Sequence, residues 1–187
     1  MPMRDDMAAA VVALALLAAS DVRAQNPYGI GRTATPAEIA GWNIDVGRDG
    51  GNLPPGSGTV SHGRELFEQQ CASCHGDKGQ GGVGDQLVGG QGTLATAKPV
   101  RTVGSYWPYA PTLFDYIRRA MPQNAPQSLS NEDVYAVSAY ILNLNGLLPA
   151  DATVDAKTLA AIKMPNRDSF VSDPRPDVKN PACTNGC

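Results

Sequence analysis

Cys71-Ala72-Ser73-Cys74-His75 places two thiols three positions apart and an imidazole directly after the second thiol. This C-x-x-C-H pattern is typical of the attachment site of a c-type haem. Each thiol can add to one vinyl group of the porphyrin, and His75 can then bind the iron as its proximal ligand. Because the pattern occurs once in the chain, we predict one covalent haem c and an electron-transfer function.

Two other kinds of site contain a C-x-x-C pair. A thioredoxin-like redox pair does not need His75 and is expected beside a βαβ pattern, which the sequence lacks. A zinc site needs two further ligands, and beyond position 24 the chain offers only His62 and the distant Cys183 and Cys187. The sequence therefore favours haem.

Residues 1–24 are typical of an export signal. The apolar run 7–19 is shorter than the roughly 20 residues that a bilayer-spanning helix needs, and Val22-Arg23-Ala24 offers a small residue at the cut site. We expect cleavage after Ala24 and a mature protein in the periplasm that does not span the membrane. The alternative is an uncleaved anchor, since two acidic residues follow Arg4 directly.

Charge limits the possible partners. The formal net charge is −3 at pH 7 and no basic run is present, so nucleic acid is not an expected partner. The mature chain is long enough for one domain with a hydrophobic core. We divide it into an N-terminal arm (25–60), a cytochrome domain (61–148) and a C-terminal extension (149–187).

Helix-start signals and hydrophobic periodicity predict an all-α fold. Thr35, Pro36 and Glu38 indicate a capping box that begins a short helix. Ser61 and Asn131 are the expected N-caps of a helix leading to Cys71 and of a long helix that ends near Asn145. Two more helices are expected over 112–120 and 155–162. No strand is predicted, because period-two alternation is missing.

The sixth iron ligand has three candidates. Met121 stands just after a predicted helix and before Pro122, where a loop can present its sulfur to the iron, and we prefer it. Met164 fits better as a side chain that fills the core. His62 lies on the helix that leads into Cys71, on the proximal side. A site without a sixth ligand is the remaining possibility.

Other residues are candidates to surround the haem. Tyr106, Trp107 and Tyr109 can line it or hydrogen-bond a propionate, and we expect a backbone carbonyl of residues 84–87 to accept from the second ring nitrogen of His75. Three arginines are either propionate partners or solvated surface charges: Arg101, Arg118 and Arg119.

Cys183 and Cys187 form C-x-x-x-C at the end of the sequence. No histidine follows, so this is not a second haem motif. In an oxidising compartment we expect a disulfide between them, with free or intermolecular thiols as the alternative.

Several of these residues together resemble class I cytochrome c: Gly63 and Phe67 before the haem motif, Met121-Pro122, and Tyr140 in the long helix. More narrowly, the chain is similar to the cytochrome subunits of periplasmic sulfite dehydrogenases and Sox-type sulfur dehydrogenases. The stretches that carry this similarity are 26–35, 56–60, 102–109, 119–122, 129–144, 164–168 and the terminal C-x-x-x-C.

The resemblance implies a class I cytochrome c fold and a partner, a molybdenum-cofactor subunit that oxidises sulfite or sulfane sulfur. The chain would be its non-catalytic, electron-accepting subunit and would pass electrons to a downstream cytochrome c or oxidase. The Sox-type subunit carries a second haem domain, and we expect a monohaem relative here. The alternatives are a free-standing cytochrome c shuttle between periplasmic dehydrogenases and a terminal oxidase, and a haem enzyme or gas sensor with an open iron site.

Overall fold

The computed structural model describes residues 30–173. The chain divides into two units, Met1–Asn43 and Ile44–Cys187, which are described separately. The expected signal peptide, the cysteine pair Cys183 and Cys187, and their predicted disulfide lie outside the described residues.

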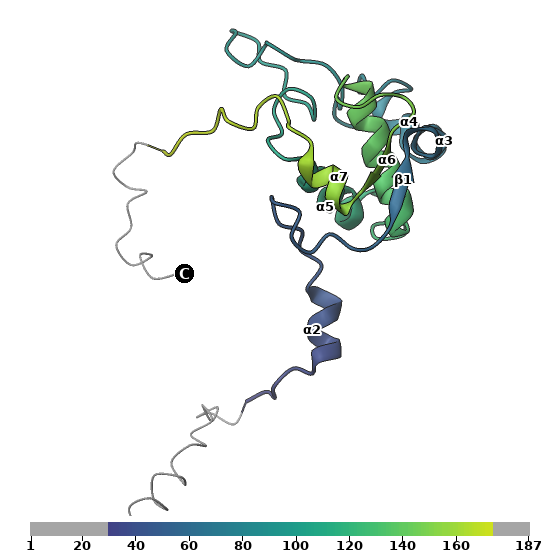
Figure 1. The fold of residues 1–187 in the computed structure, drawn as a ribbon, viewed down its shortest axis with the longest axis vertical. Coiled ribbons are helices and arrows are strands. Elements are labelled where there is room, and N and C mark those ends of the chain that lie inside the picture. The colour runs from purple at the N-terminus through teal and green to yellow at the C-terminus, as the bar shows by residue number, and fades with distance from the viewer. Residues whose placement is uncertain (1–29, 174–187) are drawn as a thin grey trace, which may run out of the picture. The chain divides into compact units, whose positions relative to one another are not determined.

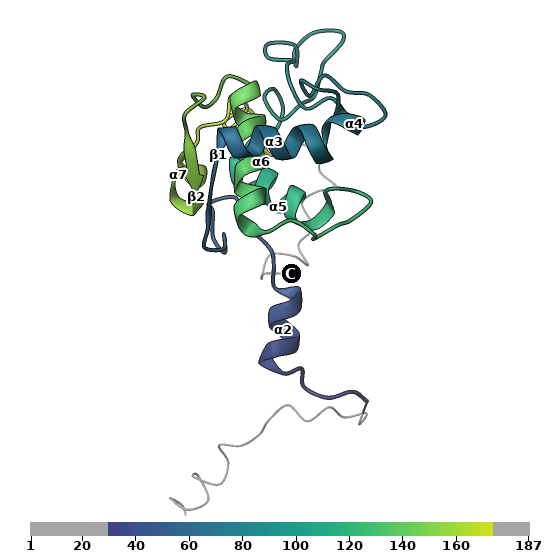
Figure 2. The same ribbon diagram turned by 90° about the vertical axis from the view of Figure 1, so that its right-hand side faces the viewer.

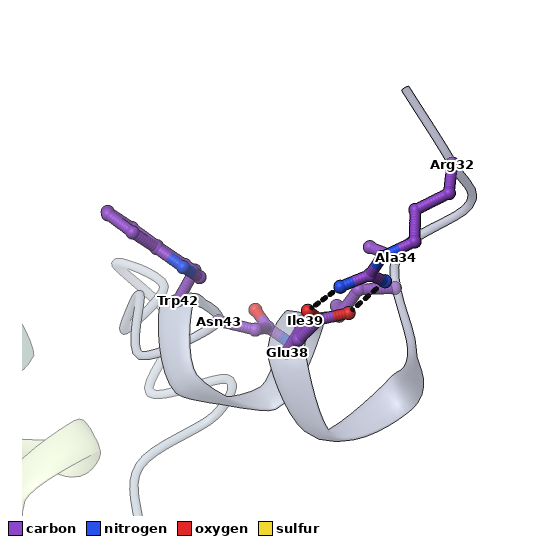
Figure 3. Close-up of a pocket in the computed structure, with 6 residues that line it drawn as sticks. All are labelled: Arg32, Ala34, Glu38, Ile39, Trp42 and Asn43. Carbon is purple, nitrogen blue, oxygen red and sulfur yellow. Dashed lines mark hydrogen bonds and ion pairs between the residues drawn. The ribbon is translucent and has the colours of Figure 1, made fainter. Parts of the chain in front are cut away.

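The described part of the first unit is a short helix, α2 (Pro36–Trp42), with its approach segment. The predicted capping box is confirmed: Thr35 Oγ1 accepts from the Glu38 backbone N–H, and the Glu38 carboxylate accepts from the Thr35 N–H at 2.8 Å. Arg32 pairs with the same carboxylate (Figure 3). No side chain of α2 is buried, and Ile39 and Trp42 are 53% and 86% exposed. Local hydrogen bonds rather than packing therefore support this helix.

Two helices form the centre of the second unit: α3 (Val60–Gln70) crosses α6 (Asn131–Leu144), as Figure 2 shows. The crossing is close because Gly63 has no side chain; a Cβ there would lie 1.9 Å from the Ala136 carbonyl oxygen. Beside it the rings of Phe67 and Tyr140 meet edge to face, with centroids 5.4 Å apart. This aromatic contact is a favourable geometry for two buried rings.

Helix α5 (Ala110–Ala120) packs on α6 from another side. Phe114 of α5 and Tyr135 of α6 are both buried, and their ring centroids are 4.4 Å apart. The short α7 (Ala156–Ala161) adds the buried Leu159 to the same core (Figure 1). The core thus lies between helices that are distant in sequence.

A small antiparallel sheet is the main departure from the all-α prediction. Strand β1 (Ser57–Thr59) pairs with β2 (Thr153–Asp155), with Gly58 opposite Val154. Three-residue strands are too short to show alternation, which explains why the sequence pattern missed them. Val154, Leu159 and Met164 of the expected C-terminal extension lie in the one core, and the division at 60/61 and 148/149 stays a prediction.

The helix boundaries correct several expected caps. Thr59, not Ser61, caps α3, and its hydroxyl accepts from the His62 N–H at 3.1 Å. Ser130, not Asn131, caps α6 in the same manner. Helix α5 begins at Ala110, two residues before the expected start, with Pro111 in its first turn. The helix expected over 155–162 is shorter, and Asp155 serves as its cap.

The search for membrane spans covers the described residues alone. In residues 30–173 no helix has the length and apolar character to cross a bilayer.

Candidate haem site

The haem motif lies at the end of α3. Cys71 is the C-cap of α3 and also the N-cap of the single-turn helix α4 (Ala72–His75). The backbone N–H groups of Cys74 and His75 both donate to the Cys71 carbonyl, at 3.1 and 3.0 Å. This turn brings the two thiols and the imidazole to one end of α3.

Both thiols are free, Cys71 half-buried and Cys74 exposed. Burial raises the pKa of the Cys71 thiol to about 11, and the neighbouring Cys74 adds to the rise. Such a thiol is almost wholly protonated near neutral pH, whereas redox cysteines rely on a lowered pKa. Cys71 is thus poorly suited to act as the attacking thiolate in thiol–disulfide exchange.

His75 is oriented by a backbone carbonyl. Its Nδ1 lies 2.7 Å from the Asp85 carbonyl oxygen, within the stretch 84–87 where a partner was expected. A carbonyl can only accept, so Nδ1 must carry the proton and Nε2 keeps its lone pair. This is the tautomer that binds iron through Nε2, with the ring held by its second nitrogen.

The glycine-rich loop after the motif approaches the imidazole closely. A Cβ at Gly84 would lie 3.0 Å from His75 Cε1 and 3.3 Å from Cys74 Cβ. The loop is tied to the motif by the Gly84 N–H, which donates to the Cys74 carbonyl at 2.9 Å, and by the Gly81 N–H, which donates to His75. A side chain at position 84 would therefore require His75 or Cys74 to shift by a few tenths of an ångström.

The three candidates for the sixth ligand occupy different surroundings. Met121 is the C-cap of α5; it is half-buried against the core, and its N–H donates to Ile117 at 3.0 Å. Met164 is 1% exposed and belongs to the core. His62 Nε2 lies 2.9 Å from Asp133 Oδ1 of α6, on the surface. The structure thus shows Met164 as a core side chain, while ligation by Met121 stays a prediction.

The aromatic candidates lie in a loop that the C-terminal segment holds. Tyr106 stacks edge to face with Phe170 at 5.6 Å, and its carbonyl accepts from the buried Asn166 at 2.6 Å. Trp107 is half-buried and meets Tyr116 of α5 at 5.7 Å. Their contact with haem stays a prediction.

The arginine candidates also have partners in the structure. Arg101 lies over the Tyr106 ring at 5.7 Å. Arg118 lies beside Arg119 in the last turn of α5. Arg167, which was not a candidate, lies over the Tyr109 ring at 5.2 Å. Arg119 is bound to Asp115 and Asp45. The sequence did not indicate these carboxylates as its partners.

Sequence reasoning missed two side chains that hold the loops of the site together. Asn145, beyond α6, accepts from the Gly89 N–H at 3.1 Å and donates to the Leu87 carbonyl at 3.2 Å. Thr102 donates to the Gly89 carbonyl and exchanges hydrogen bonds with Ser105. The sequence offered Asn145 only as a helix end, because its partners lie 56 and 58 residues away.

These residues fit a haem c. Two unpaired thiols precede an imidazole whose Nε2 is available, and a close-fitting glycine loop fixes that imidazole. Within residues 30–173, no group of three or more His, Cys, Asp and Glu side chains is placed to hold a metal ion, so the zinc alternative has no ligand set in that range. Cys71, Cys74 and His75 would hold the haem, and Met121 is the predicted second ligand of its iron.

Comparison with known proteins identifies the family. Residues 58–141 match the family described as cytochrome C oxidase, cbb3-type, subunit III. A chain in the crystal structure of the sulfane dehydrogenase SoxCD from Paracoccus pantotrophus is 42% identical, with a TM-score of 0.76, over 84% of this chain and 78% of that one. The chain belongs to the c-type cytochromes. Membership in this family implies haem c as the cofactor of this cytochrome.

A second relative is the thiosulfate dehydrogenase of Stutzerimonas stutzeri (strain A1501). It is 32% identical over 90 residues, which are 47% of this cytochrome. The match covers only 28% of that relative's own length. Both relatives are named as dehydrogenases of sulfur compounds. The resemblance to cytochromes of sulfur dehydrogenases that the sequence predicted is confirmed.

Proposed function

We propose that this protein is a periplasmic monohaem c-type cytochrome that serves as the electron-accepting subunit of a molybdenum-dependent sulfite or sulfur dehydrogenase. The observation that carries the proposal is the 42% identity to a SoxCD chain across most of both chains. The match to a thiosulfate dehydrogenase supports the same class of substrate. The free-standing shuttle is the alternative reading of the haem motif alone.

In this role the chain's own residues would bind the haem and orient its iron ligand His75. A bound haem supplies one-electron transfer between ferric and ferrous iron. Cys71 and Cys74 would attach it covalently. The Asp85 carbonyl accepts from Nδ1 of His75, which would leave Nε2 to bind the iron. The neutral thioether of Met121 would favour the ferrous state and raise the reduction potential.

The test is electron transfer with and without the dehydrogenase partner. The cytochrome is matured in a host that attaches haem c, mixed anaerobically with the molybdenum subunit, and supplied with sulfite or thiosulfate while the haem absorbance is recorded. We expect reduction only when the partner is present, and co-purification of the two proteins. Equal reduction by unrelated periplasmic dehydrogenases would favour the free-standing shuttle.

The cofactor and the location have their own measurements. Intact mass should exceed that of the polypeptide beyond Ala24 by one haem, and cell fractionation should find the protein in the periplasm. A colourless mature protein from a haem-attaching host would contradict the proposal before any partner is considered.

A further inference from the structure

Arg119 lies in the last turn of α5, two positions before Met121. Its Nε donates to Asp115 Oδ2 at 2.9 Å and its Nη2 to Asp115 Oδ1 at 3.0 Å. The same Nη2 also binds Asp45 Oδ1. A guanidinium that meets a carboxylate through two parallel hydrogen bonds is held in one orientation, which a single contact does not achieve.

We call Arg119, Asp115 and Asp45 the clamp. The clamp joins two parts of the second unit that are distant in the sequence. Asp115 Oδ1 accepts from the Val46 backbone N–H at 3.1 Å, in addition to its bonds with Arg119. Asp45 and Val46 are 74 and 69 residues from their partners in the sequence. The side chains of Asp115 and Arg119 are 22% and 34% exposed, so the central pair is partly shielded from water.

The end of a helix is the part that frays first. Arg119 fixes this last turn from both directions, to the preceding turn through Asp115 and to the chain at Asp45. Met121 follows as the C-cap, with its N–H bound to Ile117, and Pro122 after it has no N–H to bind further. These contacts of Arg119 therefore hold the end of α5 two residues before Met121.

We propose that Arg119 is a positioning residue for Met121: with Asp115 and Asp45 it fixes the end of α5 so that the methionine sulfur stays bound to the iron. This inference rests on the proposed role of Met121 as the sixth ligand. The positioning role differs from the two roles that the sequence suggested for Arg119, which were a contact with a haem propionate and a solvated surface charge.

The test compares Arg119→Gln and Arg119→Lys with the unmodified oxidised holoprotein. One readout is the weak near-infrared band of the thioether–iron bond, and the other is the affinity for imidazole, which competes with the sulfur. We expect Arg119→Gln to weaken the band and to bind imidazole about fivefold more tightly. This fold-change corresponds to the free energy lost when a partly exposed ion pair is removed. Arg119→Lys should behave similarly, because lysine keeps the charge but lacks the planar fork.

The matched control is Arg64→Gln, which removes another arginine–carboxylate pair of i,i+4 spacing, with Glu68 on α3. It should leave both readouts unchanged. The proposal fails if Arg119→Gln matches the unmodified protein, if Arg119→Lys restores both readouts fully, or if Arg64→Gln shifts them equally. Should the Arg119 variants not fold, Asp45→Ala removes only the more exposed contact and should shift imidazole affinity in the same direction. No shift in this variant overturns the proposal.

The variant Met121→Ala tests the ligand assignment separately from the positioning role of Arg119. If the band survives in Met121→Ala, the ligand assignment is wrong and the clamp has nothing to position. If the band requires Met121 but is insensitive to Arg119, only the positioning role is overturned.

Discussion

At the scale of single residues, Met121 and Met164 share a following proline in the sequence and have different surroundings in the structure. Each stands directly before a proline, yet Met164 is packed into the core while Met121 caps α5 and remains half-buried. A side chain that fills the core and one that binds a metal respond differently to removal. The pair therefore offers a direct assignment of the sixth ligand.

We predict that Met121→Ala abolishes the near-infrared thioether–iron band of the oxidised protein and lowers its reduction potential, because the soft ligand is lost. Absorption spectroscopy and a redox titration measure the two effects. A reduced protein that then binds carbon monoxide rapidly would agree with an opened iron site. An unmodified protein that already binds carbon monoxide rapidly would favour the open-site alternative instead.

Met164→Ala should destabilise the fold and leave the thioether–iron band in place. Removal of a side chain that is 1% exposed leaves a cavity, and we expect a loss of about 2–5 kcal/mol in the free energy of unfolding. Urea unfolding of the holoprotein measures this loss, and the near-infrared band should persist. Loss of the band without loss of stability would reverse the two assignments.

At the scale of elements, the crossing of α3 and α6 depends on one position without a side chain. We predict that Gly63→Ala lowers the free energy of unfolding by about 3 kcal/mol or more, because its Cβ would lie 1.9 Å from a backbone oxygen and the helices must separate. Gly41→Ala in α2 is the control, since a Cβ there meets no atom within 4 Å. Urea denaturation should show no loss for the control; equal losses would contradict the close crossing.

The pH dependence of α2 tests its ion pair. Arg32, and then the Thr35 N–H, lower the pKa of the Glu38 carboxyl from 4.5 to about 2. A lowered pKa means that the pairing is fully present above pH 4.5 and is lost as the pH falls toward about 2. NMR titration of the Glu38 side chain should show this midpoint, and Arg32→Gln should raise it. A midpoint near 4.5 in the unmodified protein would contradict the pairing.

At the scale of the whole molecule, the hydrogen bonds that support α2 lie within its own segment. Because α2 buries no side chain, we predict that deletion of residues 30–43 changes the free energy of unfolding of the second unit by less than about 0.5 kcal/mol. Urea unfolding followed by the haem absorbance measures it. A large loss would show that the segment packs on the second unit in solution.

Local signals were readable in the sequence, and long-range pairings were not. The haem motif and the Thr35–Glu38 capping box depend on residues within four positions of each other, so their spacing alone predicts them. Ser130 and Asn131 are both good caps, and only the backbone conformation at Ser130 decides between them. The clamp at Arg119 joins residues 74 apart, and no pattern along the chain reports such a contact.

The strand pair also determines how this chain tolerates change. Ser57 stands opposite Asp155, so the path from α3 through the haem motif to α6 is a loop closed at its base by two short strands. Truncations that remove β2 would open this loop, and truncations that remove α7 or Met164 would also take side chains out of the core.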